Sequence, residues 1–199
     1  MSLLDRATSR IPQPWRTILD WVVTVGFAIG FILVFEAEVA KPYRIPSSSM
    51  EPTLHCAKPG PWCQGSHNDR VIANRLVYRF ESPQRGQIVV FKAPPAAKVC
   101  GDEGGTFVKR LIGLPGEKVS ERRGRIFIDG RALEEPYIEH SFRGTESGSW
   151  PRIGKGRYFF MGDDRIHSCD SRTWGTVRRS DLIGPVLMTY WPLTRINLR

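Results

Sequence analysis

The sequence predicts a mainly β fold, in which one N-terminal transmembrane helix precedes an all-β domain. The first observation is a single long apolar run that lies between Asp20 and Glu36 and contains no charged residue. The second is that short β-rich segments alternate with turn signals after Ser66, while no later segment keeps a helical period over about ten residues. The third is composition, because 199 residues with 41% hydrophobic content suit one compact core.

The predicted membrane span covers residues 20–38. Its centre, residues 21–35, reads WVVTVGFAIGFILVF. This centre is short for a hydrocarbon core, which needs about 17 to 25 helical residues, so Asp20 and Glu36 are expected in the headgroup layer. A cleavable signal peptide is the alternative, since a positive flank, an apolar centre and the small residues of EAEVA also suit such a segment.

The charge of the N-terminal flank predicts the orientation of the chain. Residues 1–19 carry more positive than negative charge, so they are expected to stay in the cytoplasm. Residues 39–199 then form an extracytoplasmic domain of a single-pass plasma-membrane protein. The net charge of +9 is scattered, which argues against a nucleic-acid partner and favours contact with anionic membrane lipid. The cations of the flank are Arg6, Arg10 and Arg16.

Six segments of the extracytoplasmic part have the composition of β-strands. They are bounded by glycine, proline and asparagine or aspartate, as strands usually are. Asp129 and Gly130 predict a two-residue hairpin turn between two of them. In chain order the segments read VIANRLVYRF, QIVVFK, TFVKRLIG, RIFIDGRAL, GRYFFMGD and LIGPVLMTYW.

All four cysteines follow the apolar run, on the side of the membrane where disulfides persist. Three pairings are possible, and Cys56 with Cys63 is favoured because the two enclose a proline- and glycine-rich turn. His55 and His67 lie beside them, so a small zinc site is an alternative, but the irregular spacing disfavours it and no metal is expected. The other two cysteines are Cys100 and Cys169.

A lysine within the segment TFVKRLIG is a candidate for chemistry. In a strand Phe107, Lys109 and Leu111 share one face, so the amine either reaches a sheet edge or lies in a dry place. Desolvation can lower the pKa of a lysine by about 3 to 5 units. A neutral amine beside a serine hydroxyl can then remove its proton, which is the Ser-Lys form of nucleophilic catalysis.

The order of the motifs resembles that of a bacterial type I signal peptidase, a membrane-anchored Ser-Lys serine endopeptidase. The matching stretches follow the apolar run: YRIPSSSMEPTL, RGQIVVFK, FVKRLIGLPGEKV and GDDRIHSCDSRTWG. The resemblance implies a coiled antiparallel sheet and an activity that needs no metal or cofactor. It further implies that the chain removes N-terminal signal peptides from exported preproteins at the membrane surface, after small residues at positions −1 and −3. The implied partners are these preproteins, the export machinery that delivers them and membrane lipid.

The resemblance also implies roles for individual residues. Ser49 matches the nucleophile and Lys109 its general base. Ser47 matches an oxyanion-hole donor, which acts together with the Ser49 backbone N–H, and Ser168 matches the residue that orients the base. The walls of the pockets for the small substrate residues match Tyr43, Ile45 and Phe107.

The last motif departs from the usual family pattern at Asp164, Ile166 and His167. These departures place an extra carboxylate near the base, and we expect the arginines of the motif region, Arg110, Arg165 and Arg172, to hold such carboxylates. A Ser-His-Asp arrangement around His167 is disfavoured, since nothing in the sequence places this histidine against Ser49.

Two alternatives stay open at the level of the sequence. One is a specialised maturation peptidase of a conjugation or pilus system, which would act on a dedicated substrate. The other is a catalytically inactive, membrane-tethered β-domain that binds peptides.

Overall fold

The computed structural model describes residues 13–101 and 105–199, and the chain divides into two compact units between Val39 and Ala40. The first unit holds helix α2, Gln13–Glu38, whose apolar window is Trp15–Leu33 with a mean hydropathy of 1.7. The window begins before the predicted span because apolar residues precede Asp20. The flank cations Arg6 and Arg10 lie outside the described residues.

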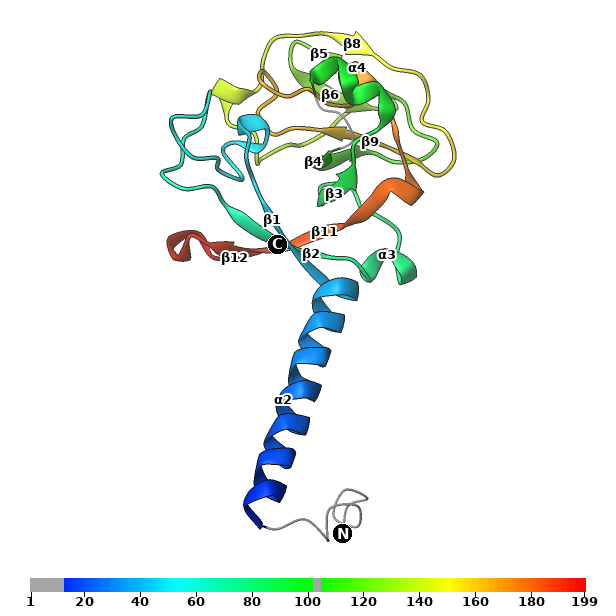
Figure 1. Cartoon of the computed structure of the whole chain (residues 1–199). Coiled ribbons are helices and arrows are strands. Elements are labelled where there is room, and N and C mark those ends of the chain that lie inside the picture. The colour runs from blue at the N-terminus through cyan, green and yellow to red at the C-terminus, as the bar shows by residue number, and fades with distance from the viewer. Residues whose placement is uncertain (1–12, 102–104) are drawn as a thin grey trace. The chain divides into compact units, whose positions relative to one another are not determined.

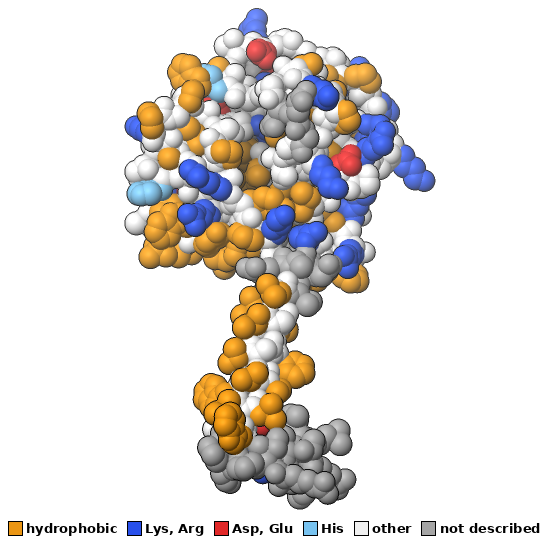
Figure 2. Space-filling model, in the orientation of Figure 1, with side chains coloured by type: hydrophobic (Ala, Val, Ile, Leu, Met, Phe, Trp, Pro, Cys, Tyr) orange, Lys and Arg blue, Asp and Glu red, His pale blue; other side chains and the backbone are white. Residues whose placement is uncertain are grey.

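Helix α2 is long enough to cross a bilayer. Its 26 residues correspond to about 39 Å at 1.5 Å per residue. Its apolar side chains are exposed over the window, as the space-filling view shows (Figure 2). An exposed apolar helix of this length is consistent with a membrane anchor, and the predicted N-terminal helix is confirmed.

The second unit is an antiparallel β domain with a curled main sheet of eight strands (Figure 1). The strand order is β1-β2-β11-β3-β4-β9-β10, with β12 paired to β11. The fold class predicted from the sequence is therefore confirmed. The strands are β1 (Ala40–Arg44), β2 (Arg70–Asn74), β3 (Ile88–Lys92), β4 (Thr106–Gly113), β9 (Arg157–Met161), β10 (Val177–Arg178), β11 (Leu182–Trp191) and β12 (Asn197–Leu198).

A smaller sheet has the order β7-β6-β5-β8. The expected two-residue turn joins two of its strands, and Asp129 and Gly130 have the positive φ values, 47° and 84°, that such a turn requires. The strands of this sheet are β5 (Val119–Arg122), β6 (Arg125–Ile128), β7 (Arg131–Ala132) and β8 (Gly148–Ser149).

Short helices connect the strands. Their bounds are α3 (Val77–Phe80), α4 (Ser171–Trp174) and, as 3-10 turns, η1 (Ser48–Met50), η2 (Pro95–Cys100), η3 (His140–Phe142), η4 (Arg179–Asp181) and η5 (Leu193–Arg195).

The segment VIANRLVYRF is not one strand, as the sequence suggested. Strand β2 ends at Asn74, and the rest of the segment forms a turn and helix α3. The side-chain oxygen of Asn74 accepts hydrogen bonds from the backbone N–H groups of Leu76 and Val77, at 2.9 and 3.1 Å. These bonds stabilise a turn instead of a continued strand.

The central strands are buried on both faces, which explains their continuous apolar sequences. In β3, Ile88 and Val90 pack into one core cluster, while Val89 and Phe91 pack into another. Neighbouring β4 is buried from Lys109 to Gly113, so a polar side chain in this part of the strand is kept from water.

Two disulfides join loops of the domain, Cys56–Cys63 and Cys100–Cys169. The favoured pair is present, and its sulfurs are bonded to each other and therefore do not form the alternative zinc site. The second disulfide connects η2 to the loop that follows β9.

Candidate active site

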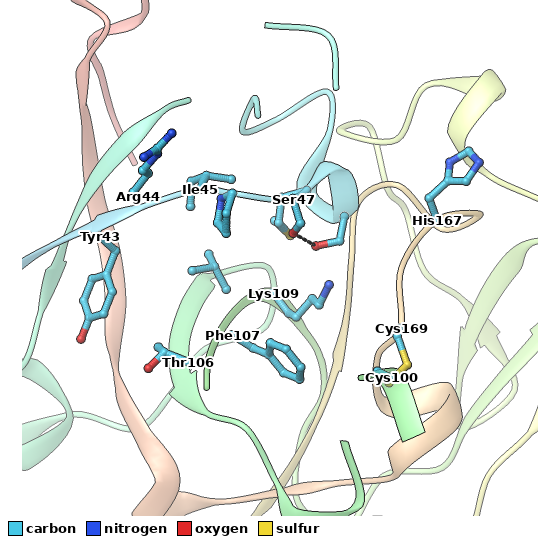
Figure 3. Close-up of a pocket in the computed structure, with 14 residues that line it drawn as sticks. Tyr43, Arg44, Ile45, Ser47, Cys100, Thr106, Phe107, Lys109, His167 and Cys169 are labelled. Carbon is cyan, nitrogen blue, oxygen red and sulfur yellow. Dashed lines mark hydrogen bonds between the residues drawn. A yellow bond between two sulfur atoms is a disulfide. The ribbon is translucent and has the colours of Figure 1, made fainter. Parts of the chain in front are cut away.

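One cavity of about 450 Å³ collects residues that the sequence singled out from two separate segments. The loop that follows β1 contributes serines, and β4 contributes the lysine. Figure 3 shows the labelled side chains around this cavity. Of the seven predicted site residues, the six that line it are Tyr43, Ile45, Ser47, Ser49, Phe107 and Lys109.

Packing and backbone hydrogen bonds fix the serine turn. The extended path of β1 continues to Ile45, whose N–H donates to the backbone oxygen of Asp69 at 2.9 Å. The chain then turns in η1, where Met50 is buried in the core beside Ile45. The two hydroxyl oxygens of Ser47 and Ser49 end 3.3 Å apart at the cavity.

Lys109 is buried, with 4% of its surface exposed. Its Nζ donates a hydrogen bond to Ser168 Oγ at 3.0 Å and lies 5.8 Å from the centre of the Phe107 ring. The amine points toward the turn that carries Ser47 (Figure 3). Burial lowers the pKa of Lys109 to about 8, against a smaller opposing effect of Asp170. The structure thus places Ser168 against the amine.

The carboxylates around the lysine are held by other cations. Asp163 accepts two hydrogen bonds from Arg110, at 2.8 and 2.5 Å. Asp170 accepts from Arg172 Nε at 2.9 Å. Among the residues that the structure describes, no carboxylate forms an ion pair with Lys109, so nothing of this kind fixes the proton on its amine.

The extra carboxylate of this chain is held by a histidine. Asp164 is fully buried, and it accepts from the backbone N–H of His167 at 3.1 Å and contacts Nδ1 of the same ring at 2.9 Å. Arg165, one of the three arginines expected to hold carboxylates of this motif, forms its ion pair with another residue, Glu135.

Comparison with known proteins shows the family of the chain. Residues 18–191 match the family model described as signal peptidase, peptidase S26. The chain belongs to this family. The family and the activity predicted from the sequence are therefore confirmed: a signal peptidase I is a serine endopeptidase that cleaves signal peptides from exported preproteins.

Alignments with similar proteins cover most of the chain. A probable signal peptidase I-1 of Synechocystis is 36% identical over 94% of this chain and 89% of its own length. The signal peptidase I of Mycobacterium tuberculosis is 30% identical over 92% of this chain and 76% of its own length. A crystal structure of a signal peptidase I from Enterococcus faecalis is 31% identical, covers 53% of this chain and 97% of that chain, and has a TM-score of 0.44.

Sequence reasoning missed the buried partner of Arg165 in this member of the signal peptidase family. Arg165 forms a two-pronged ion pair with Glu135, and neither side chain is exposed. Its Nε also donates to the backbone oxygen of Gly162 at 2.9 Å. The pair fixes the loop that leads to Ser168, and no pattern around Glu135 indicated it.

The residues that line the cavity without having been predicted as site residues include two from the last motif and a cysteine that is bonded to one of them. The signal for His167 and Cys169 was their position in the last motif, but the sequence assigned the histidine to a supporting loop and the cysteine to a structural or disulfide role. The disulfide partner of Cys169 is Cys100.

Gly162 is a point of close approach in the signal peptidase site. A Cβ atom at this position would lie 2.2 Å from Ser168 Oγ and 2.3 Å from the backbone oxygen of Ser49. Both groups therefore lie within 2.3 Å of the position that a Cβ atom would occupy. Only glycine, which has no Cβ atom, leaves this position free.

Replacing Gly162 by alanine is expected to displace Ser168 or the serine turn. A displacement of about 1 Å lowers catalytic rates by about 100-fold, and overpacking destabilises a fold by about 1 to 3 kcal/mol. Preprotein cleavage and thermal unfolding measure the two effects. Gly154→Ala is the matched control, since its Cβ would be 3.6 Å from the nearest atom of Arg157. Equal behaviour of the two variants would contradict the close approach.

Proposed function

We propose that the chain removes signal peptides with Ser49 as nucleophile and Lys109 as general base. The observation that carries this proposal is a buried amine that lacks a carboxylate partner among the described residues and lines the same cavity as Ser49. A neutral amine accepts the proton of the Ser49 hydroxyl while Oγ attacks the scissile carbonyl carbon.

The hydrogen bond to Ser168 supports this role. Lys109 uses one N–H to donate to Ser168 Oγ, which fixes the direction of the remaining groups on the nitrogen. The lone pair of the neutral amine is then free to face Ser49. Ser168 acts in this way as an orienting residue for the base.

The carbonyl oxygen becomes an oxyanion as the tetrahedral intermediate forms. Ser47 Oγ and the backbone N–H of Ser49 are the proposed donors to it, and such donors are each worth about 2.7 to 4 kcal/mol. Protonated Lys109 then gives its proton to the nitrogen of the leaving mature protein, and the C–N bond breaks. The signal peptide remains as an ester on Ser49.

Hydrolysis of this ester completes the cycle. Lys109, neutral again, takes a proton from a water molecule, whose oxygen attacks the ester carbonyl. The C–O bond to Ser49 breaks, the Ser49 oxygen takes back the proton, and the signal peptide leaves with a carboxylate end. Every proton is carried by groups of this chain or by water.

Two open strand edges at the cavity suit an extended substrate. Strand β1 is an end strand of the main sheet. In β4, residues from Arg110 onward pair with β9, whereas the described residues from Thr106 to Lys109 pair with β3 alone. A signal peptide strand can therefore pair with backbone groups of either edge, by strand addition.

The side chains between these edges suit small substrate residues. Tyr43, Ile45 and Phe107 line the cavity, and their bulk leaves room for residues such as alanine at positions −1 and −3. This specificity is part of the proposal.

The location is also part of the proposal. We infer that α2 anchors the chain in the plasma membrane with its N-terminus in the cytoplasm and the β domain outside. The two disulfides support this orientation, because disulfides persist outside the cytoplasm. The anchor keeps the site near preproteins that emerge from the export machinery.

The pH dependence of cleavage tests the mechanism. Because the base must be neutral and burial lowers the pKa of Lys109 to about 8, kcat/KM should rise with pH and level off above about pH 8. The measurement is preprotein cleavage in detergent between pH 6 and 10.

A metal chelator serves as the control in the same assay and should leave the profile unchanged. A rate that is highest near pH 6 and falls as Lys109 loses its proton would contradict the proposed base. Absence of cleavage at every pH would favour the peptide-binding alternative.

A further inference from the structure

Two stacked aromatic rings stand at the rim of the catalytic cavity. Trp62 and His167 lie with ring centroids 4.1 Å apart and an angle of 15° between their planes. His167 lines the cavity, and the residue surface of Trp62 is 65% exposed. The pair therefore joins the reaction cavity to a flat aromatic surface that is open to solvent.

The backbone of Trp62 is in an unfavourable conformation. Its φ angle is +62°, a left-handed value that bulky residues rarely adopt. A large apolar side chain gains little from such exposure, and residues held in strained conformations concentrate at functional sites.

Trp62 belongs to a loop that is fastened to the serine turn. The Cys56–Cys63 disulfide closes this loop. Glu51, fully buried just after the serine turn, accepts hydrogen bonds from the backbone N–H groups of Cys56 and Gln64, both at 3.0 Å. The indole is thus held by a rigid support.

His167 is held against the same turn from the other side. Asp164 fixes its ring through Nδ1 and its backbone through N–H. The backbone N–H of Asp164 in turn donates to the backbone oxygen of Ser49 at 3.2 Å. Both rings are therefore held by residues that lie beside Ser49, the proposed nucleophile: Glu51 binds the loop of Trp62, and Asp164 binds His167.

The two rings lie on the side of the cavity that would receive the residues after the scissile bond. Figure 3 shows His167 and Tyr43 on opposite sides of Ser47. The proposed function, on which this inference rests, assigns the signal peptide residues to the side of Tyr43, Ile45 and Phe107. The chain that follows the scissile bond must then leave past His167.

We propose that Trp62 and His167 form a binding site for one of the first three residues of the mature protein and favour an aromatic side chain there. The open face of the indole stacks on such a ring. His167, with Nδ1 directed at Asp164, keeps the indole in place. This pair adds a specificity determinant beyond the small residues at −1 and −3.

The test compares preproteins that differ at one position among +1, +2 and +3, with phenylalanine or alanine at that position. At one position the wild-type protein should cleave the phenylalanine substrate with the higher kcat/KM. Trp62→Gly should lower the phenylalanine-to-alanine ratio by about 2- to 10-fold, the range typical of an aromatic pair. Glycine accepts a positive φ without strain, so this variant should fold.

Two control variants isolate the stacking. Trp62→Phe retains an aromatic face and should keep most of the ratio. Phe80→Ala removes another exposed aromatic side chain, 84% exposed on α3, and should leave the ratio unchanged.

The outcomes separate this inference from the proposed function. In one outcome the wild-type protein cleaves the substrates, while Trp62→Gly has the same phenylalanine-to-alanine ratio of kcat/KM as the wild type at all three positions. That result would overturn the inference alone. The same follows if Trp62→Gly slows both substrates equally. No cleavage of any substrate by the wild-type protein would overturn the proposed function and the inference together.

Discussion

Replacement of Ser49 by alanine is expected to lower kcat for preprotein cleavage by about 10⁴- to 10⁶-fold, the range for loss of a serine nucleophile. The Ser49 hydroxyl is the only group proposed to form a covalent bond with the substrate. The backbone N–H of residue 49 and the strand edges remain, so a signal peptide should still bind. Single-turnover cleavage and direct peptide binding measure the two quantities.

Ser48→Ala is the matched control for this variant. Ser48 is the neighbouring serine in the same turn, is buried like Ser49, and is not among the residues that line the cavity. The Ser48→Ala variant should cleave preproteins at nearly the wild-type rate. Normal cleavage by Ser49→Ala, or equal loss in both variants, would contradict the assignment of the nucleophile.

Replacement of Lys109 by methionine is expected to lower kcat by about 10²- to 10⁴-fold, the contribution of a positioned general base. Methionine has a similar length and fits a dry environment, so the cavity should keep its shape. The rising limb of the pH profile should disappear as well, because the titrating amine is gone. Lys92→Met is the control, since Lys92 is an exposed lysine at the end of β3.

The same substitution should stabilise the fold. The pKa of Lys109 falls from 10.5 to about 8 on folding, which corresponds to about 3 kcal/mol of unfavourable free energy at 1.36 kcal/mol per unit. Loss of the hydrogen bond to Ser168 offsets about 1 kcal/mol. The free energy of unfolding at pH 7 should therefore rise by about 2 kcal/mol.

The sign of this effect follows from proton linkage. Between about pH 8 and 10.5 the unfolded amine binds a proton that the folded amine does not, so the wild-type protein gains stability as the pH rises. The advantage of Lys109→Met should be complete below pH 8 and disappear toward pH 10.5. Urea unfolding at several pH values measures it. An advantage that does not change with pH would mean that Lys109 is charged in the folded protein.

Local patterns were sufficient for helix α2 and for seven of the twelve strands in the described residues. The apolar run predicted helix α2, and short β-rich segments between turn signals predicted strands such as β3, β4 and β11. Asp129 and Gly130 fixed a hairpin, since the turn type depends on these two residues alone. The segment after Asn74 was misread, because one asparagine side chain diverted an apolar stretch from strand to helix.

The order of motifs was sufficient for the family, but contacts within the site needed the fold. The sequence placed Ser49 and Lys109 in motifs without showing which carboxylate faces which cation. Arg165 was expected to hold a nearby aspartate, whereas it binds Glu135 in another loop. Such pairings depend on how distant loops pack, and many arginines and carboxylates were available.

The sequence by itself determined the apolar N-terminal helix, the antiparallel strands and the signal peptidase family, since these depend on short-range patterns and on short motifs. Only the tertiary structure decided that Lys109 loses contact with water, that Gly162 lets Ser168 and the serine turn meet, and that Trp62 covers His167. Each of these contacts joins residues far apart in the chain. Their energies arise from burial and close packing, which exist only after the sheet has closed around them.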